Sequence, residues 1–320
     1  MFVGREIASA LGPIERALAP HAPVILIYHR VVADSAEDIW GIAVGRDRFA
    51  EQIEALTRVR RVLPLGELAA AAAQGRRYDR PLAAVTFDDG YHDVFTAARP
   101  ILERFDCPAT VFVVTGLVDA PREFWWDELE FIFLETPRLP AELRTTFGRE
   151  TVEWRFPEGV QSARTGPCHY LRRYFLGQPS EKVEAHLAAL RDWAGLSRPA
   201  RAKHRAMGSG ELAQLNDGLI AVGAHTVTHP ALPVLPPERQ AQEIAASRKA
   251  CEALTGRPVP HFAYPFGRYD RASRSACREA GFAQACATIP GPVRRWSDPF
   301  LLPRIAPGQA DGEALARRLS

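Results

Sequence analysis

The chain has 320 residues, 47% of them hydrophobic and 24% charged, which is typical of a folded globular protein and excludes extended disorder. Its 40 basic and 38 acidic residues nearly cancel, so the charge balance gives no support to a nucleic-acid partner. Five cysteines, none in a Cys-x-x-Cys pair, argue against a disulfide framework and favour a reducing compartment.

The N-terminal segment has apolar side chains at roughly helical spacing: Phe2, Val3, Ile7, Leu11, Ile14 and Leu18. We expect a packed helix here, with a weak membrane-surface helix as the alternative. Arg5 and Glu6 interrupt any apolar core of a signal peptide. The sequence has no stretch of about 18 uncharged apolar residues, so we expect no transmembrane helix. The expected location is therefore cytoplasmic, with peripheral contact at the inner face of the membrane left open.

Strands and helices alternate along the first part of the chain. Apolar runs predict buried parallel strands at 23–29, 82–87 and 109–114. Amphipathic patterns predict helices between them at 47–57, 65–75 and 94–105. This alternation is typical of parallel βα units.

The alternation breaks between residues 121 and 207, where we expect mostly helices and one hairpin turning at Gly148. It then returns with strands predicted at 219–225, 261–267 and 282–288, and helices at 209–215, 237–254 and 272–281. We interpret the chain as a single α/β domain over 1–320, barrel-like, with residues 121–207 as a mostly helical insertion within it.

Polar side chains follow four of the predicted strands at the points where the strands end. They are His29, Asp88 and Asp89, His225 and His229, and the segment Tyr264-Pro265-Phe266-Gly267. In a barrel of βα units these strand ends meet at one rim, so we expect the side chains to share a site.

A carboxylate and two imidazoles form a three-ligand site for zinc or a similar cation and leave a position for water. His225 and His229 are four residues apart, so in a helical turn both rings can face one ion. Asp88 and Asp89 point apart on an extended segment, so one can bind the ion while the other acts as general base. Either pattern alone is more often a chance pairing or a turn; their combination predicts a hydrolytic metal site.

The motifs TFDDG (Thr86–Gly90) and HTVTH (His225–His229) resemble the first two motifs of the polysaccharide deacetylase family, also called carbohydrate esterase family 4, which includes nodulation-type chitooligosaccharide deacetylases. The resemblance covers about residues 24–305 without the insertion and implies a distorted, incomplete (β/α)7-type barrel. It also implies that Asp88 is the general base and that Asp89 joins His225 and His229 on a divalent metal. Zinc is the expected ion, with Co²⁺, Ni²⁺ or Mn²⁺ as alternatives.

Pro265-Phe266-Gly267 resembles the family's third motif, which implies that the backbone N–H of Phe266 helps to hold an oxyanion. The arginine that the family often has before this motif is missing here. Arg304 is our candidate to pair with the base instead, with an ordinary surface arginine as the alternative. The family's C-terminal Leu-x-His motif is missing too, because no histidine follows His261.

A similar pattern, LIYHR (Leu26–Arg30), ends the first strand, and closure of the barrel would place the first and last strands side by side. We therefore predict that His29 is the general acid that protonates the leaving amine, with a loop-ordering role as the alternative. Five further residues are candidates for substrate contact: Trp125, Trp126, Asp127, Tyr264 and Pro265.

The predicted activity is hydrolysis of an N-acetyl (N-acyl) group from a sugar in a cell-surface polysaccharide, an oligosaccharide or a lipid-linked saccharide. One alternative is a deformylase, O-acetyl esterase or amidase on the same fold. The other is a non-catalytic carbohydrate-binding homologue. The sequence does not predict the sugar, the acyl group or the oligomeric state.

Overall fold

The computed structural model describes residues 21–320 except 34, 36–37, 77, 149 and 216–217. Its contacts form two compact units, residues up to 119 with 206–320 (the barrel unit) and residues 120–205 (the inserted unit). The inserted unit nearly coincides with the predicted insertion. The predicted N-terminal helix lies outside the described residues, and within them no helix is long and apolar enough to span a bilayer.

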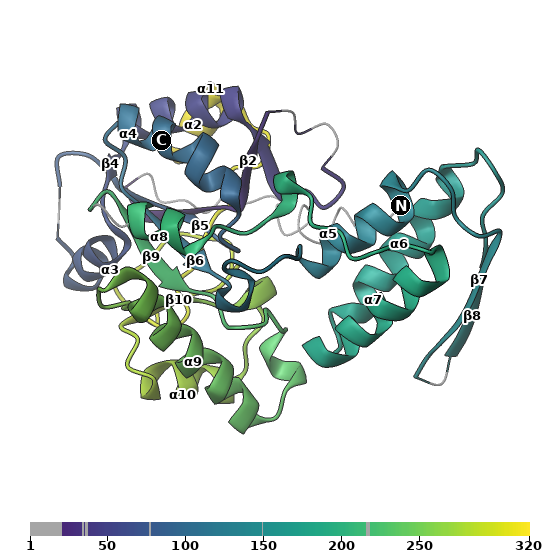
Figure 1. The fold of residues 1–320 in the computed structure, drawn as a ribbon. Coiled ribbons are helices and arrows are strands. Elements are labelled where there is room, and N and C mark those ends of the chain that lie inside the picture. The colour runs from purple at the N-terminus through teal and green to yellow at the C-terminus, as the bar shows by residue number, and fades with distance from the viewer. Residues whose placement is uncertain (1–20, 34, 36–37, 77, 149, 216–217) are drawn as a thin grey trace. The chain divides into compact units, whose positions relative to one another are not determined.

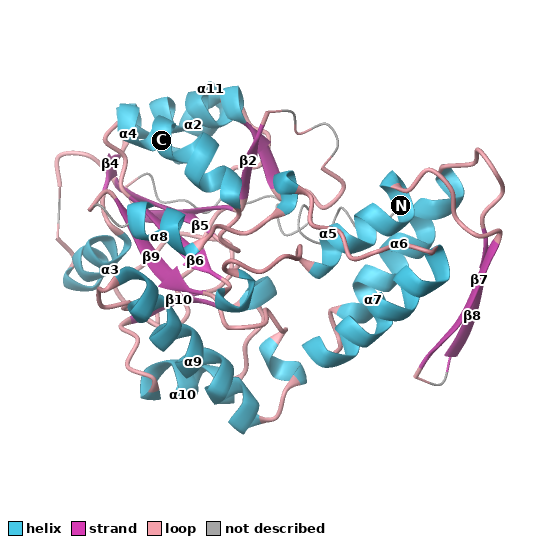
Figure 2. Cartoon of the chain, viewed as in Figure 1, coloured by secondary structure: helices cyan, strands magenta, loops and turns pink. Residues whose placement is uncertain are grey.

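A seven-stranded parallel sheet forms the centre of the barrel unit (Figures 1 and 2). Its strands are β1 (Val24–Tyr28), β4 (Arg61–Val62), β5 (Leu82–Phe87), β6 (Ala109–Val113), β9 (Ile220–Ala224), β10 (His261–Ala263) and β11 (Gln284–Cys286). The order is β1-β5-β6-β9-β10-β11, with β4 paired to β5. Every residue of β1, β5, β6 and β10 is buried, as expected for parallel strands covered on both faces.

Residues 302–305 join the two edges of this sheet. Leu302 bridges Cys286 of β11, and Ile305 bridges Leu26 of β1, both in the parallel sense. Backbone hydrogen bonds of Ile305 with Ile25 and Ile27 reinforce the second contact. Because the segment makes isolated bridges and no full strand, the barrel is incomplete, as the family resemblance implied.

Helices surround the sheet in Figure 1, in the alternation expected of βα units. They are α2 (Arg46–Val59), α3 (Leu65–Gln74), α4 (Arg99–Arg104), α8 (Ser209–Leu215), α9 (Pro237–Thr255), α10 (Arg271–Glu279) and α11 (Gly312–Leu319). The helix predicted at 94–105 begins as a π-helical turn, η3 (Val94–Ala98). Further short turns are η4 (Thr115–Leu117), η7 (Leu232–Val234) and η8 (Pro265–Gly267). A small parallel pair, β2 (Arg30–Val32) and β3 (Ala43–Gly45), was not predicted, because three-residue strands are too short to show a periodic pattern.

The inserted unit has its own small core. Its elements are α5 (Trp125–Glu130), η5 (Phe131–Glu135), β7 (Glu142–Phe147), β8 (Glu150–Arg155), α6 (Ser162–Phe175), α7 (Ser180–Ala194) and η6 (Ala202–His204). β7 and β8 form the predicted antiparallel hairpin, and Gly148 in its turn adopts φ 63°. Phe133, Leu171, Phe175 and Leu187 are buried where the helices meet.

Candidate active site

Three side chains that could hold a metal meet at the carboxyl ends of β5 and β9. Asp89 Oδ1 lies 3.5 Å from His225 Nε2 and 3.1 Å from His229 Nε2. The two imidazole Nε2 atoms are 3.1 Å apart, and all three side chains are buried. Among the residues that the structure describes, these three side chains form a group whose potential ligand atoms lie close enough together to hold one metal ion.

This donor set fits a zinc-like ion. Tetrahedral zinc with ligand bonds of 2.0–2.2 Å separates its ligand atoms by about 3.3 Å, which lies within the observed spacing. His225 Nδ1 donates to the Ala263 carbonyl at 2.7 Å, which orients the ring so that its Nε2 faces Asp89 and His229. Burial lowers the pKa of His229 despite the nearby Asp89 carboxylate, which favours the neutral imidazole that a metal ligand requires.

The loop that connects the two histidines is not a helical turn, so the conformation expected from their spacing is wrong. Thr226 and His229 have φ values of 66° and 58°, in the left-handed region that residues other than glycine rarely adopt. The Thr226 hydroxyl oxygen accepts the His229 N–H at 3.0 Å and stabilises this conformation. The rings therefore meet, with centroids 4.8 Å apart, through a tight loop and not through a helix.

Asp88 is held by Arg304 in a buried, bidentate pair. The two guanidinium nitrogens lie 2.6 and 2.7 Å from the two carboxylate oxygens. Arg304 Nε also donates to the Ala287 carbonyl at 3.0 Å, which fixes the orientation of the guanidinium plane. Burial raises the pKa of Asp88. The charges of Arg304, His225 and His29 together lower this pKa by more than burial raises it, so the net shift is downward. The Asp88 carboxylate is therefore ionised, as a general base must be.

His29 follows β1 directly and is half-buried at the same end of the barrel. The carbonyl of the preceding residue, Tyr28, accepts the Asp88 N–H at 2.9 Å, which places the backbone of His29 beside that of Asp88. The charge of His29 is among the influences that lower the pKa of Asp88 and of Asp89. The structure thus brings the predicted acid, base and metal ligands to one rim.

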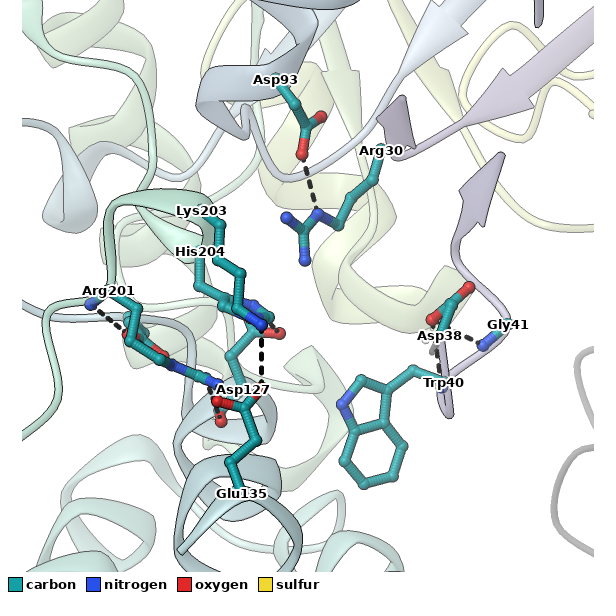
Figure 3. A network of polar contacts seen from close by, with 11 residues as sticks. Arg30, Asp38, Trp40, Gly41, Asp93, Asp127, Glu135, Arg201, Lys203 and His204 are labelled. Atoms are coloured by element: carbon teal, nitrogen blue, oxygen red, sulfur yellow. Dashed lines mark hydrogen bonds and ion pairs between the residues drawn. The ribbon is translucent and has the colours of Figure 1, made fainter. Parts of the chain in front are cut away.

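A salt bridge ties the start of β2 to the segment that follows Asp89. Arg30 Nε donates to Asp93 Oδ2 at 2.9 Å, and the Val31 N–H donates to Asp93 Oδ1 at 3.0 Å. Figure 3 shows the Arg30–Asp93 contact. Because His29 precedes Arg30, this contact helps to fix the position of the histidine.

Comparison with known proteins gives a family match for part of the chain. The polysaccharide deacetylase family model matches residues 75–136 and 199–285, which include both aspartates, both histidine ligands and Phe266. These two segments are similar to the polysaccharide deacetylase family. A curated relative in Bacillus subtilis (strain 168), named "Putative polysaccharide deacetylase YxkH", is 29% identical over 93 residues, 28% of this chain. The match spans 33% of that relative.

Solved structures of deacetylases share the fold. The Streptococcus pyogenes deacetylase PplD, in complex with acetate, aligns with a TM-score of 0.62 and 18% identity over 93% of this chain and 98% of its own. IcaB from Ammonifex degensii aligns with a TM-score of 0.61 and 20% identity over 95% and 100%. These likenesses confirm the predicted barrel-like fold.

The segment that resembles the family's third motif forms the turn η8, beside the three candidate metal ligands. Phe266 has φ 56°, and its ring packs edge-on against His229 with centroids 4.5 Å apart. A Cβ on Gly267 would lie 1.7 Å from the Thr288 hydroxyl, so this position requires glycine. The oxyanion role of the Phe266 N–H stays a prediction.

Two substrate contacts expected in this motif need correction. Tyr264 is fully buried, and its hydroxyl donates to the Phe300 carbonyl at 3.1 Å. Pro265 is buried as well. Tyr264 is a core residue because it packs edge-on against Phe262 of β10, with ring centroids 5.3 Å apart. Neither side chain is placed to contact a sugar.

The aromatic residues that open the inserted unit pack within it. Trp126 stacks on Phe124 with centroids 4.6 Å apart, and Trp125 is half-buried. Asp127 pairs with His204 Nδ1 at 3.1 Å, and its carbonyl accepts a hydrogen bond from Arg201 (Figure 3). These contacts show a structural role inside the unit; contact of these residues with substrate stays a prediction.

Sequence reasoning missed Glu243, which lies on α9 and faces the loop between the two histidines. The available signal was polar residues on the buried face of a helix. Gln240, Glu243 and Ser247 are buried on the same helix as Ile244 and Cys251. A polar side chain at a core-facing position needs a partner there, and for Glu243 that partner is the metal-ligand loop.

Proposed function

We propose that this domain is a metal-dependent hydrolase that removes an N-acetyl or related N-acyl group from a sugar. The observation that carries the proposal is the convergence of Asp89, His225 and His229 beside a second, ionised carboxylate, Asp88. A binding protein has no need for a buried base next to a metal site. Zinc suits the donor set, with Co²⁺, Ni²⁺ and Mn²⁺ as alternatives.

Each residue has a distinct task in this proposal. An ion held by Asp89, His225 and His229 would supply Lewis-acid activation of the acyl oxygen and of water. Asp88, kept ionised by Arg304, accepts the proton of the attacking water. His29 donates a proton to the departing amine nitrogen, and the Phe266 N–H donates to the developing oxyanion. The products are a free amino sugar and a carboxylic acid.

The proposed substrate is an N-acetylated saccharide of a cell-surface polysaccharide, an oligosaccharide or a lipid-linked sugar. The family match supports a polysaccharide substrate in general terms, because the family is named for deacetylation of polysaccharides. In the inserted unit, half-buried Trp125 is the remaining candidate for sugar contact, because Trp126 and Asp127 are buried.

The test combines metal analysis with product analysis on the purified protein. We expect about one equivalent of a divalent metal, acetate release from N-acetylated oligosaccharides, and loss of that release in Asp88→Asn. Release of formate instead would indicate a deformylase, and release of acetate only from O-acetyl sugars would indicate an esterase. Saccharide binding without any product, by metal-loaded protein, would overturn the enzymatic proposal.

A further inference from the structure

The loop between the two metal-ligating histidines is bound from the side of α9 by one carboxylate. Glu243 Oε2 accepts the Val227 N–H at 2.8 Å and the Thr228 N–H at 2.9 Å. Its Oε1 accepts the Thr228 hydroxyl at 2.7 Å. The side chain is 7% exposed, so these three bonds form where water competes little.

This loop needs such support because its backbone is strained. Thr226 and His229 both adopt positive φ, a conformation that is unfavourable for a residue other than glycine and persists only when surrounding contacts hold it. The loop must nevertheless keep the two imidazole Nε2 atoms 3.1 Å apart. A small change in its backbone would separate the rings.

Two carbonyl groups of the loop are bound by η4. The Thr115 N–H donates to the Thr226 carbonyl at 3.2 Å, and the Gly116 N–H donates to the Val227 carbonyl at 2.9 Å. A Cβ on Gly116 would lie 2.5 Å from that carbonyl oxygen, so the approach requires glycine. The Val227–Thr228 segment is thus bound through its carbonyl by η4 and through its N–H groups by α9.

We propose that Glu243 is a positioning residue that sets the affinity of the metal site by fixing this loop. The inference rests on the proposed metal site. Both carboxylate oxygens face donors of the loop, so the residue acts through Val227 and Thr228 and not on the substrate. Residues that orient metal ligands typically change metal affinity by 10–100-fold when they are replaced.

A graded set of variants tests this inference. Glu243→Ala removes all three hydrogen bonds, Glu243→Gln keeps an acceptor oxygen but loses the charge, and Thr228→Val removes only the hydroxyl bond. The matched control is Glu238→Ala, because Glu238 is an exposed glutamate on the same helix. Zn²⁺ and Co²⁺ serve as probes in competition titrations against a chromophoric chelator, with no substrate present. The visible spectrum of bound Co²⁺ reports the coordination geometry.

We expect Zn²⁺ affinity to fall about 10–100-fold in Glu243→Ala, less in Glu243→Gln and least in Thr228→Val, with no change in Glu238→Ala. The Co²⁺ spectrum should change in the same order, while kcat at saturating metal recovers towards the native value. If Glu243→Ala does not fold, the other two variants carry the test. Affinities within twofold of native across the folded variants overturn the role of Glu243. A native protein that binds neither ion overturns the metal site itself.

Discussion

Arg304 donates two parallel hydrogen bonds to Asp88 inside the barrel, from a position 216 residues further along the chain. Arg304 belongs to the segment that bridges β11 to β1, and Asp88 follows β5. The backbone contacts that join the two edges of the sheet therefore also position Arg304 beside Asp88, the proposed base. Closure of the barrel and ionisation of Asp88 are linked through this pair.

Arg304→Met should destabilise the fold strongly. Removal of one partner of a buried ion pair leaves the other charge unpaired, which costs about 3–5 kcal/mol. The double variant Arg304→Met with Asp88→Leu should recover most of this stability while remaining inactive, because it removes both charges. Urea unfolding followed by circular dichroism measures both effects. A single-variant loss below about 1 kcal/mol would contradict a strongly coupled pair.

His29→Gln should affect amide and ester substrates differently. A general acid contributes about 10²–10⁴-fold to a reaction whose leaving group needs a proton. We expect a loss of that size with an N-acetylated oligosaccharide. With 4-nitrophenyl acetate, whose leaving group departs without protonation, the loss should stay under about tenfold. Asp88→Asn is the control, since a missing base should slow both substrates. Equal losses in His29→Gln would instead indicate a loop-ordering role.

The sequence predicted the members of this site better than its geometry. Asp89, His225 and His229 follow buried parallel strands, and such strands end at one edge, so their convergence was predictable. The conformation of the loop was not predictable, because a spacing of four residues is equally compatible with a helical turn and with a loop. Positive φ at Thr226 and His229 leaves no composition signal, since both positions lack glycine.

Tyr264 and Glu243 show a second limit of sequence reasoning. Tyr264 lies in a motif at a strand end, which suggested an exposed rim position, but its side chain packs on the same face as Phe262 and is buried. Glu243 reads as a surface charge on a helix, and only the three-dimensional packing of α9 against the metal-ligand loop shows its partners. The wrong prediction for Tyr264 and the omission of Glu243 both concern the direction in which a side chain faces, which depends on tertiary packing.

Asp89→Asn should remove metal from the protein. The amide offers a neutral oxygen in place of the anionic ligand, so we expect Zn²⁺ affinity to fall by more than the roughly 100-fold upper range of an indirect effect. Elemental analysis after dialysis against metal-free buffer measures the bound ion. His92→Ala is the control, because that histidine pairs with Glu211 at 2.8 Å. Retention of a full equivalent of metal by Asp89→Asn would contradict the assignment of this ligand.

His261 should make the fold less stable in mild acid. It lies on β10 with 8% of its surface exposed, and burial lowers its pKa to about 4. Between pH 6.5 and about 4 the unfolded chain therefore binds a proton that the folded chain does not, so stability falls as the pH falls through this range. The loss attributable to this group is about 3 kcal/mol.

The variant His261→Gln isolates this effect, because the other ionisable groups remain the same in both proteins. Urea unfolding at pH 7.5, 5.5 and 4.5 gives the free energy of unfolding of each protein. The native protein should lose about 2–3 kcal/mol more than the variant between the highest and lowest pH. Any cost of the substitution itself is present at every pH and cancels from this comparison. Parallel stability curves would mean that the buried imidazole takes up its proton without leaving the fold.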